Sequence, residues 1–210
     1  MSEESQKENE NPNSNNVIKL IMVGDSGTGK TNLISVAAGL EFNTSSLTTT
    51  SCSYVQKVIK KGDEEYRVNL WDTIGQEKYR SLTKIFVKDS KIVIFVYDIT
   101  KKETFDSLIY WKKLIDDILG KVSSMAVVGN KIDLYLEEQV SEKEGKDFAN
   151  SIGAIFKLTS AKNDPNSIGE LVDKMLDDFI EKNKNKIEKK RNSTKLKKAN
   201  NNNNKKQKCC

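Results

Sequence analysis

The sequence contains no histidine, and it has only two prolines and three cysteines among its 210 residues. Without histidine, the chain has neither an imidazole acid or base nor the imidazole ligands that many metal sites use. Cys52 stands alone, whereas Cys209 and Cys210 are adjacent. This spacing is neither a disulfide framework nor a zinc site, so a reducing, cytosolic compartment is the simplest interpretation.

Long apolar runs are also missing. No stretch approaches the roughly 18 apolar residues of a membrane-spanning helix, and residues 1–16 contain no apolar run at all. We therefore expect no membrane span and no secretory signal.

The charge is distributed unevenly along the chain. Residues 1–16 carry a net charge of −3 and residues 181–210 carry +10, so with +5 for the whole chain residues 17–180 carry −2. The basic character therefore belongs to the tail and not to the fold. We expect a disordered acidic extension (1–16), one folded domain (17–181) and a flexible polybasic tail (182–210). Such a tail can be a solubilising segment, a nucleic-acid arm or a membrane tether.

Hydrophobic patterning between the tails predicts an α/β fold. Continuous or alternating apolar residues predict six strands, near 17–23, 54–60, 66–71, 91–97, 125–128 and 154–158. Helical spacing predicts helices between them, and Thr100, Ser141 and Ser167 each precede a glutamate by three residues, as in a capping box. Right-handed crossovers then give a six-stranded, mostly parallel sheet with one antiparallel strand and helices on both faces.

A glycine-rich turn follows the first predicted strand and precedes the first helix. It comprises Gly24, Asp25, Ser26, Gly27, Thr28, Gly29, Lys30 and Thr31. Glycines let successive N–H groups point at anionic oxygens, and the helix N-terminus adds its positive dipole end. Lys30 can reach the β- and γ-phosphates and Thr31 can ligate Mg²⁺. The strand and the helix favour a phosphate-binding P-loop over an ordinary glycine turn with a surface lysine.

A second polar motif, Asp72 to Glu77, closes the third predicted strand. Asp72 can hold Mg²⁺ through water as the acidic element of a P-loop NTPase. Gly75 can offer its N–H to a γ-phosphate, and the neutral Gln76 can orient a water molecule. Taken alone, the motif also fits a solvated turn with a helix-capping aspartate.

Two further motifs, each found at a predicted strand end, point to guanine. They are Asn130-Lys131-Ile132-Asp133 and Thr159-Ser160-Ala161-Lys162. Asp133 can accept hydrogen bonds from the N1–H and the amine of guanine, whereas adenine would leave the carboxylate unpaired. The Lys131 stem can lie over the base, and Ala161 can donate its N–H to O6. The alternative for the first string is an ordinary turn.

Taken together, these motifs resemble those of a small GTPase of the Ras superfamily, and within it the Rab family, over about residues 17–180. The resemblance implies a P-loop NTPase fold (the small G domain). Family spacing puts the switch I threonine, a ligand of Mg²⁺, at Thr49, and an aromatic ring that packs against guanine at Phe42. Residues 78–83 and 95–100 are similar to Rab stretches. The terminal cysteines, Cys209 and Cys210, would carry geranylgeranyl groups.

The sequence departs from the Rab pattern at two places. After Thr49 stand Thr50-Ser51-Cys52-Ser53-Tyr54 where the family usually has Ile-Gly-Val-Asp-Phe. This surface faces effectors in the family, so the resemblance does not identify the partners of this chain. Ile74 replaces the usual alanine beside Gly75. A β-branched residue there crowds the turn that presents Gln76, and we predict slower intrinsic hydrolysis than Ile74→Ala would show.

The first hypothesis is a membrane-tethered switch that binds GTP or GDP with Mg²⁺, hydrolyses GTP with Gln76 and regulates vesicular traffic. Its expected partners are an exchange factor, a GTPase-activating protein, effectors, the prenylation machinery and a lipid-extracting inhibitor, but not nucleic acid. Its expected place is the cytoplasmic side of an intracellular membrane, with a cytosolic pool. The alternatives are a membrane-recruited scaffold that binds GTP but barely hydrolyses it, and a nucleotide kinase, which Asp133 argues against.

Overall fold

The computed structural model describes residues 16–43, 53–73 and 85–184. The strands are β1 (Val17–Val23), β2 (Ser53–Lys61), β3 (Glu64–Asp72), β4 (Ile92–Asp98), β5 (Ser124–Asn130) and β6 (Ile155–Leu158). They form one sheet in the order β2-β3-β1-β4-β5-β6, in which only the β2–β3 pair is antiparallel. The predicted sheet is confirmed in strand number and in direction.

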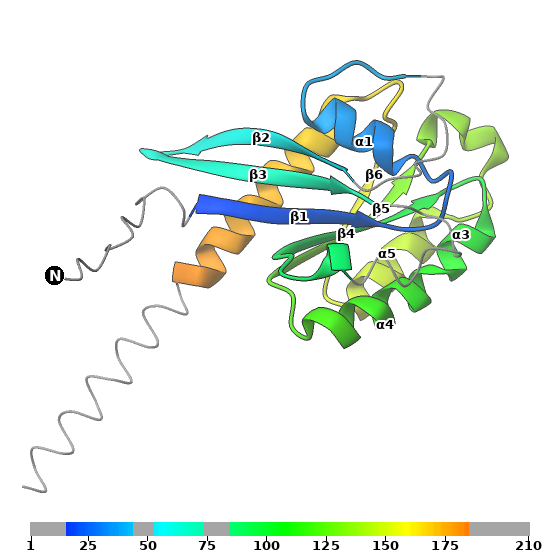
Figure 1. The fold of residues 1–210 in the computed structure, drawn as a ribbon. Coiled ribbons are helices and arrows are strands. Elements are labelled where there is room, and N and C mark those ends of the chain that lie inside the picture. Colours follow the sequence, from blue (N-terminus) through cyan, green and yellow to red (C-terminus); the bar gives the residue numbers. More distant parts are fainter. Residues whose placement is uncertain (1–15, 44–52, 74–84, 185–210) are drawn as a thin grey trace, which may run out of the picture.

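Helices cover both faces of the sheet (Figure 1). They include α1 (Lys30–Ala37), α3 (Lys102–Asp106), α4 (Leu108–Leu119), the 3-10 helix η3 (Ile132–Glu137), α5 (Glu142–Ser151) and a C-terminal helix described over 166–184. Side chains of α1 and the C-terminal helix pack on one face, for example Leu33 and Val172 against Leu20. The other face packs against α4 and α5, for example Phe95 against Trp111 and Ala149. None of the helices in the described ranges is long and apolar enough to span a membrane.

The predicted helix starts were right at one place and wrong at two. Ser141 caps α5 in a reciprocal capping box with Glu144. Thr100 does not cap a helix, because its hydroxyl donates to the buried Asp98 carboxylate at 2.8 Å, and α3 starts only after Lys101. Ser167 lies inside the C-terminal helix, where its hydroxyl donates to a carbonyl of the preceding turn.

The carboxyl ends of β1, β3, β4, β5 and β6 meet at one edge of the sheet, because these five strands are parallel to one another. The polar motifs of the sequence follow the ends of four of them. Ligands of open α/β sheets bind at this kind of edge. The amino ends of the strands form the opposite edge, beside the last turns of α4 and of the C-terminal helix.

Candidate functional site

The loop between β1 and α1 depends on glycine at two places. Gly24 and Gly29 have φ angles of 149° and 92°. A Cβ atom on Gly24 would lie 2.1 Å from the Val96 carbonyl oxygen, and one on Gly29 would lie 2.3 Å from Asn130 Nδ2. Any larger residue would therefore push the loop away from β4 and β5. Ser26 and Gly27, at the tip of the loop, are exposed.

Lys30 starts α1 and turns its ammonium group back over the loop. Its Nζ donates to the carbonyl oxygens of Gly24 (2.7 Å) and Asp25 (2.8 Å), and the side chain is buried. Burial lowers the pKa of Lys30 to about 8, although Asp72 and Asp25 act in the opposite direction. The preceding residue, Gly29, provides no side-chain cap for the first N–H groups of α1. An ammonium group beside the N–H donors at a helix N-terminus can bind a chain of phosphates.

Thr31 and Asp72 are brought together from α1 and from the end of β3. The Thr31 hydroxyl donates to Asp72 Oδ2 at 2.7 Å, and the carboxylate is buried. Thr73 follows Asp72 and donates its own hydroxyl to the Met22 carbonyl at 2.7 Å, which fixes the end of β3 against β1. A hydroxyl and a carboxylate are the hard oxygen donors that Mg²⁺ prefers. The described residues contain no group of three or more acidic or cysteine side chains that could hold a metal ion, so phosphate oxygens and water would have to complete an octahedral shell here.

Asn130, at the end of β5, joins the two motif regions. Its Nδ2 donates to the Thr28 carbonyl of the phosphate loop at 2.9 Å, and its Oδ1 accepts from the Thr159 hydroxyl at 3.3 Å. The side chain is buried, so both bonds are shielded from water. The amide thus links the phosphate loop to the loop after β6.

Lys131 and Asp133 follow Asn130 in a tight turn. Lys131 has a left-handed backbone (φ 69°), and its ammonium group pairs with the fully buried Asp98 at 2.6 Å. The Asp133 Oδ1 accepts from the Ser160 hydroxyl at 2.6 Å. Ser160 in turn accepts from the backbone N–H of Asn163. The carboxylate and the lysine stem are therefore held in place at the same sheet edge as the phosphate loop.

The remaining predicted residues lie partly within and partly outside the described ranges. Ala161 is buried next to Ser160, and Lys162 is exposed. Phe42 is partly buried and packs against the core on the α1 side of the sheet. Thr49, Gly75, Gln76, Cys209 and Cys210 lie outside the described residues.

Sequence reasoning missed two long-range contacts of this edge. Trp111 of α4 donates its indole N–H to Asp25 Oδ1 at 2.8 Å. Asp98 of β4 holds Lys131, as described above. In the sequence Trp111 is one residue of an apolar helical stripe and Asp98 ends an apolar strand, so nothing local indicates either contact.

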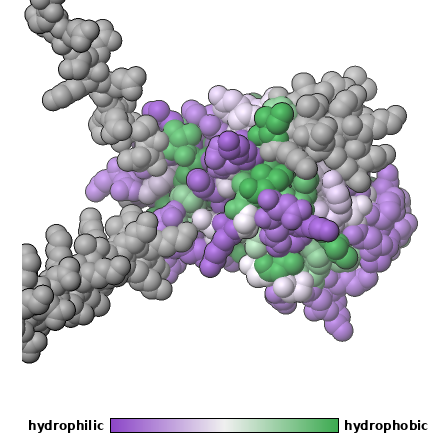
Figure 2. All heavy atoms as spheres, turned by 60° about the horizontal axis from the view of Figure 1, so that its bottom comes forward, coloured by the Kyte–Doolittle hydropathy of each residue, from purple (hydrophilic) through white to green (hydrophobic). Residues whose placement is uncertain are grey.

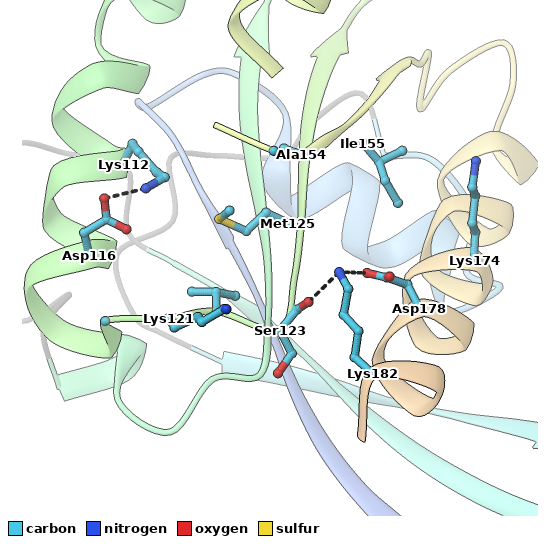
Figure 3. A pocket seen from close by; sticks show the side chains of 13 residues that line it. Lys112, Asp116, Lys121, Ser123, Met125, Ala154, Ile155, Lys174, Asp178 and Lys182 are labelled. Carbon is cyan, nitrogen blue, oxygen red and sulfur yellow. Dashed lines mark hydrogen bonds and ion pairs between the residues drawn. The ribbon is translucent and has the colours of Figure 1, made fainter. Parts of the chain in front are cut away.

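A hollow of about 910 Å³ lies at the opposite edge of the sheet (Figure 3). Lys182 donates there to the Ser123 carbonyl and pairs with Asp178, and Lys112 pairs with Asp116. None of the residues predicted to bind a ligand lines this hollow.

The fold and the phosphate loop define a P-loop nucleotide-binding domain. The sequence model of the Ras family matches residues 19–182. The chain is 35% identical over 166 residues to the Ras-related protein Rab-12 of Mus musculus, covering 79% of this chain and 68% of that protein. It is 38% identical over 144 residues to the Ras-related protein Rab-21 of Geodia cydonium, covering 69% and 63%.

The chain therefore belongs to the Ras family, and its similarity to these two relatives places it with the Rab proteins. It is a Rab-like small GTPase, which binds GTP or GDP and hydrolyses GTP.

Proposed function

We propose that the polar edge described above is the guanine-nucleotide site of this GTPase. The observation that carries the proposal is the bond from Asn130 Nδ2 to the Thr28 carbonyl, because it places the guanine motif beside the phosphate loop. Lys30 and the N–H groups of residues 25–31 would bind the phosphates. Asp133, Lys131, Ser160, Ala161 and Lys162 would surround the base, and Phe42 would pack against it.

Thr31, Asp72 and Thr49 would hold Mg²⁺. The fit rests on the 2.7 Å contact between the Thr31 hydroxyl and the Asp72 carboxylate, both of which carry oxygen donors. The ion would neutralise phosphate charge when bound. Lys30 would add a fixed positive charge from the other side of the loop.

Selection of guanine over adenine would rest on Asp133. Its carboxylate can accept hydrogen bonds from both N1–H and the amine at C2, and Ser160 holds it in position. A test is to extract the nucleotide from the purified protein and to compete it with GDP, ADP and xanthosine diphosphate. We expect GDP alone to compete at equal concentration. Equal competition by ADP would reject this assignment.

Hydrolysis would depend on Gln76, which can orient the attacking water because its amide both donates and accepts. Loss of the third phosphate would release Thr49 and Gly75, and so end effector binding. Single-turnover hydrolysis of bound GTP should fall strongly in Gln76→Leu and should rise in Ile74→Ala. Equal hydrolysis rates in Ile74→Ala and the unaltered protein would contradict the prediction that Ile74 crowds this turn. We also expect rapid turnover only with an activating protein, which would supply an arginine or reorganise Gln76.

Effectors would bind an aromatic surface on the α4 side of β2 and β3. Tyr54 is 52% exposed and stacks on Trp71 with ring centroids 4.9 Å apart, and the Lys19 ammonium lies 4.4 Å from the Trp71 centroid. Ile85 is 68% exposed after the gap in the described chain. Figure 2 looks toward this side of the molecule, where hydrophobic residues lie among hydrophilic ones. Exposed apolar side chains with a polar rim are typical of interaction surfaces.

Membrane association would come from the tail. The relatives support a role in membrane traffic, and residues 181–210 carry a net charge of +10 before Cys209 and Cys210. Two lipid chains, or one chain and a polybasic segment, anchor a protein stably, so geranylgeranylation of these cysteines would suffice. We accordingly propose three parts, an acidic extension (1–16), the G domain (17–181) and the tether (182–210). Prenylation enzymes and a lipid-extracting inhibitor would act on the tether, and the extracted protein would form a cytosolic pool.

The membrane proposal is tested by mass spectrometry of the protein isolated from its own cells. We expect isoprenoid groups on the terminal cysteines, and loss of membrane sedimentation in Cys209→Ser/Cys210→Ser. Unmodified cysteines in a protein that still sediments with membranes would contradict it.

A further inference from the structure

We infer that Trp111 is a positioning residue for the phosphate loop, and that its indole N–H controls how long the nucleotide stays bound by holding the Asp25 carboxylate. The inference rests on the proposed nucleotide site and adds a residue from outside its motifs. The two residues are 86 positions apart, and Trp111 Nε1 lies 2.8 Å from Asp25 Oδ1.

Trp111 is well placed to act as a fixed point. The side chain is 1% exposed and packs in the core between α4 and the sheet. Its backbone N–H bonds to the Ser107 carbonyl at the start of α4, and its ring makes an edge contact with Tyr110. An indole has one N–H donor and no acceptor, so a buried tryptophan can satisfy its polar atom with a single bond. That bond goes to the phosphate loop.

Asp25 is the residue of the loop on which other contacts converge. Its carbonyl oxygen accepts from Lys30 Nζ at 2.8 Å and from the Thr28 hydroxyl at 2.9 Å. The side chain of the same residue is bonded to Trp111. The indole therefore fixes the residue whose main chain holds the lysine and the buried threonine, although Trp111 itself belongs to a helix outside the loop.

The loop has two lateral supports as a result. Asn130 holds Thr28 from the side of β5, and Trp111 holds Asp25 from the side of α4. Both are buried donors acting on a loop whose tip, Ser26 and Gly27, is exposed. Loss of either support leaves the loop more conformations in which its N–H groups do not converge. A nucleotide should then dissociate faster, since the ordering of the loop costs part of the binding free energy.

The decisive experiment is a double-mutant cycle on the release of GDP from the full chain. Trp111→Phe keeps an aromatic ring and removes the N–H, and Asp25→Ala removes the acceptor. We expect each variant to release a fluorescent GDP analogue about ten-fold faster, because a hydrogen bond to a charged group is lost. The double variant should release it no more than about two-fold faster than either single variant. Multiplied effects in the double variant would overturn the inference.

Asp25→Asn separates the bond from the charge. The asparagine Oδ1 can still accept from the indole, so release should be clearly slower than in Asp25→Ala. Release as fast as in Asp25→Ala would show that the charge matters and the bond does not.

NMR provides a measurement that would not change if Trp111 only contributed packing. The chain has two tryptophans, so the GDP-bound protein gives two indole N–H signals, and Trp71 serves as an internal reference. Asp25→Ala should move the Trp111 signal upfield and speed its exchange with deuterated solvent, whereas Asp25→Asn should preserve slow exchange. An unchanged Trp111 signal in Asp25→Ala would reject the contact itself. A protein that binds no GDP at all would instead reject the proposed nucleotide site.

Discussion

The two edges of the sheet use polar side chains in different ways. At the carboxyl-end edge, they are mostly buried and bond across elements that are far apart in sequence, as in Thr31 with Asp72 and Asn130 with Thr28. At the amino-end edge, the ion pairs around the hollow lie within single helices, as in Lys182 with Asp178 (Figure 3).

This difference is a guide to function. Buried polar groups cost free energy unless they are fully paired, so a fold that gathers several of them at one edge has a use for them there. Exposed ion pairs within a helix contribute little, and they border many surface hollows. A hollow of about 910 Å³ therefore indicates a site less strongly than the network of bonds at the other edge does.

The largest expected effect is that of removing the ammonium group of Lys30. Lys30→Ala should weaken GDP binding by about two to three orders of magnitude, because charge-assisted bonds to phosphate are lost inside a buried loop. Isothermal titration of the nucleotide-free protein measures the change. Lys174→Ala is the matched control, since this lysine lines the opposite hollow and should leave GDP affinity as it is. If purified Lys30→Ala still carries stoichiometric GDP, the proposed difference in function between the two edges of the sheet is wrong.

Asp133→Asn should change the preferred base and lower GDP affinity about 100-fold, because the asparagine amide can no longer accept from both donors of guanine. Xanthine has a carbonyl at C2 in place of the amine of guanine, and the asparagine amide can donate to it. The ratio of xanthosine diphosphate to GDP affinity, measured by competition, should therefore rise. An unchanged preference for GDP would mean that Asp133 serves only to pair with Ser160.

Much of this edge could be predicted from the sequence because its motifs are local. The strand, glycine turn and helix around Lys30 occupy adjacent segments, and the apolar runs fix the parallel strands whose ends carry Asp72 and Asn130. On the proposal above, the identity of the base also follows from residue chemistry, since the Asp133 carboxylate can accept from both donors of guanine.

The contacts that escaped prediction depend on burial in three dimensions. Asp98 is fully buried, accepts hydrogen bonds from the Thr100 N–H and hydroxyl, and forms an ion pair with Lys131. Because the Thr100 hydroxyl is used in this way, it does not cap the helix that its sequence pattern predicts. Trp111 has the spacing of a core residue, and it is one, but its single polar atom points at Asp25. Neither the pair of Asp98 with Lys131 nor the bond of Trp111 to Asp25 can be read from the sequence, because the two partners lie far apart along the chain.

The affinity for GDP should fall as pH rises through about 8. Burial lowers the pKa of Lys30 to about 8, so above this pH the free protein loses the positive charge that phosphate requires, and binding must take up a proton. We expect roughly ten-fold weaker binding at pH 9 than at pH 7, because about one molecule in ten keeps the proton. Calorimetry in buffers of different ionisation enthalpy should show nearly one proton taken up at pH 9. If no proton is taken up at pH 9, the charge of Lys30 does not change when GDP binds, and the prediction is wrong.

The smallest effect is expected at the opposite edge. Lys182 donates to the Ser123 carbonyl at 3.0 Å and pairs with Asp178 at 2.7 Å, but its side chain is 51% exposed. Lys182→Ala should therefore lower the free energy of unfolding by no more than about 1 kcal/mol and change GDP release less than two-fold. Asn130→Ala removes a buried donor of similar bond length and should speed release at least ten-fold. Denaturant unfolding and GDP release measured on both variants make the comparison direct. Fast release in Lys182→Ala would mean that the two edges are energetically coupled, because no bond of Lys182 touches the nucleotide edge.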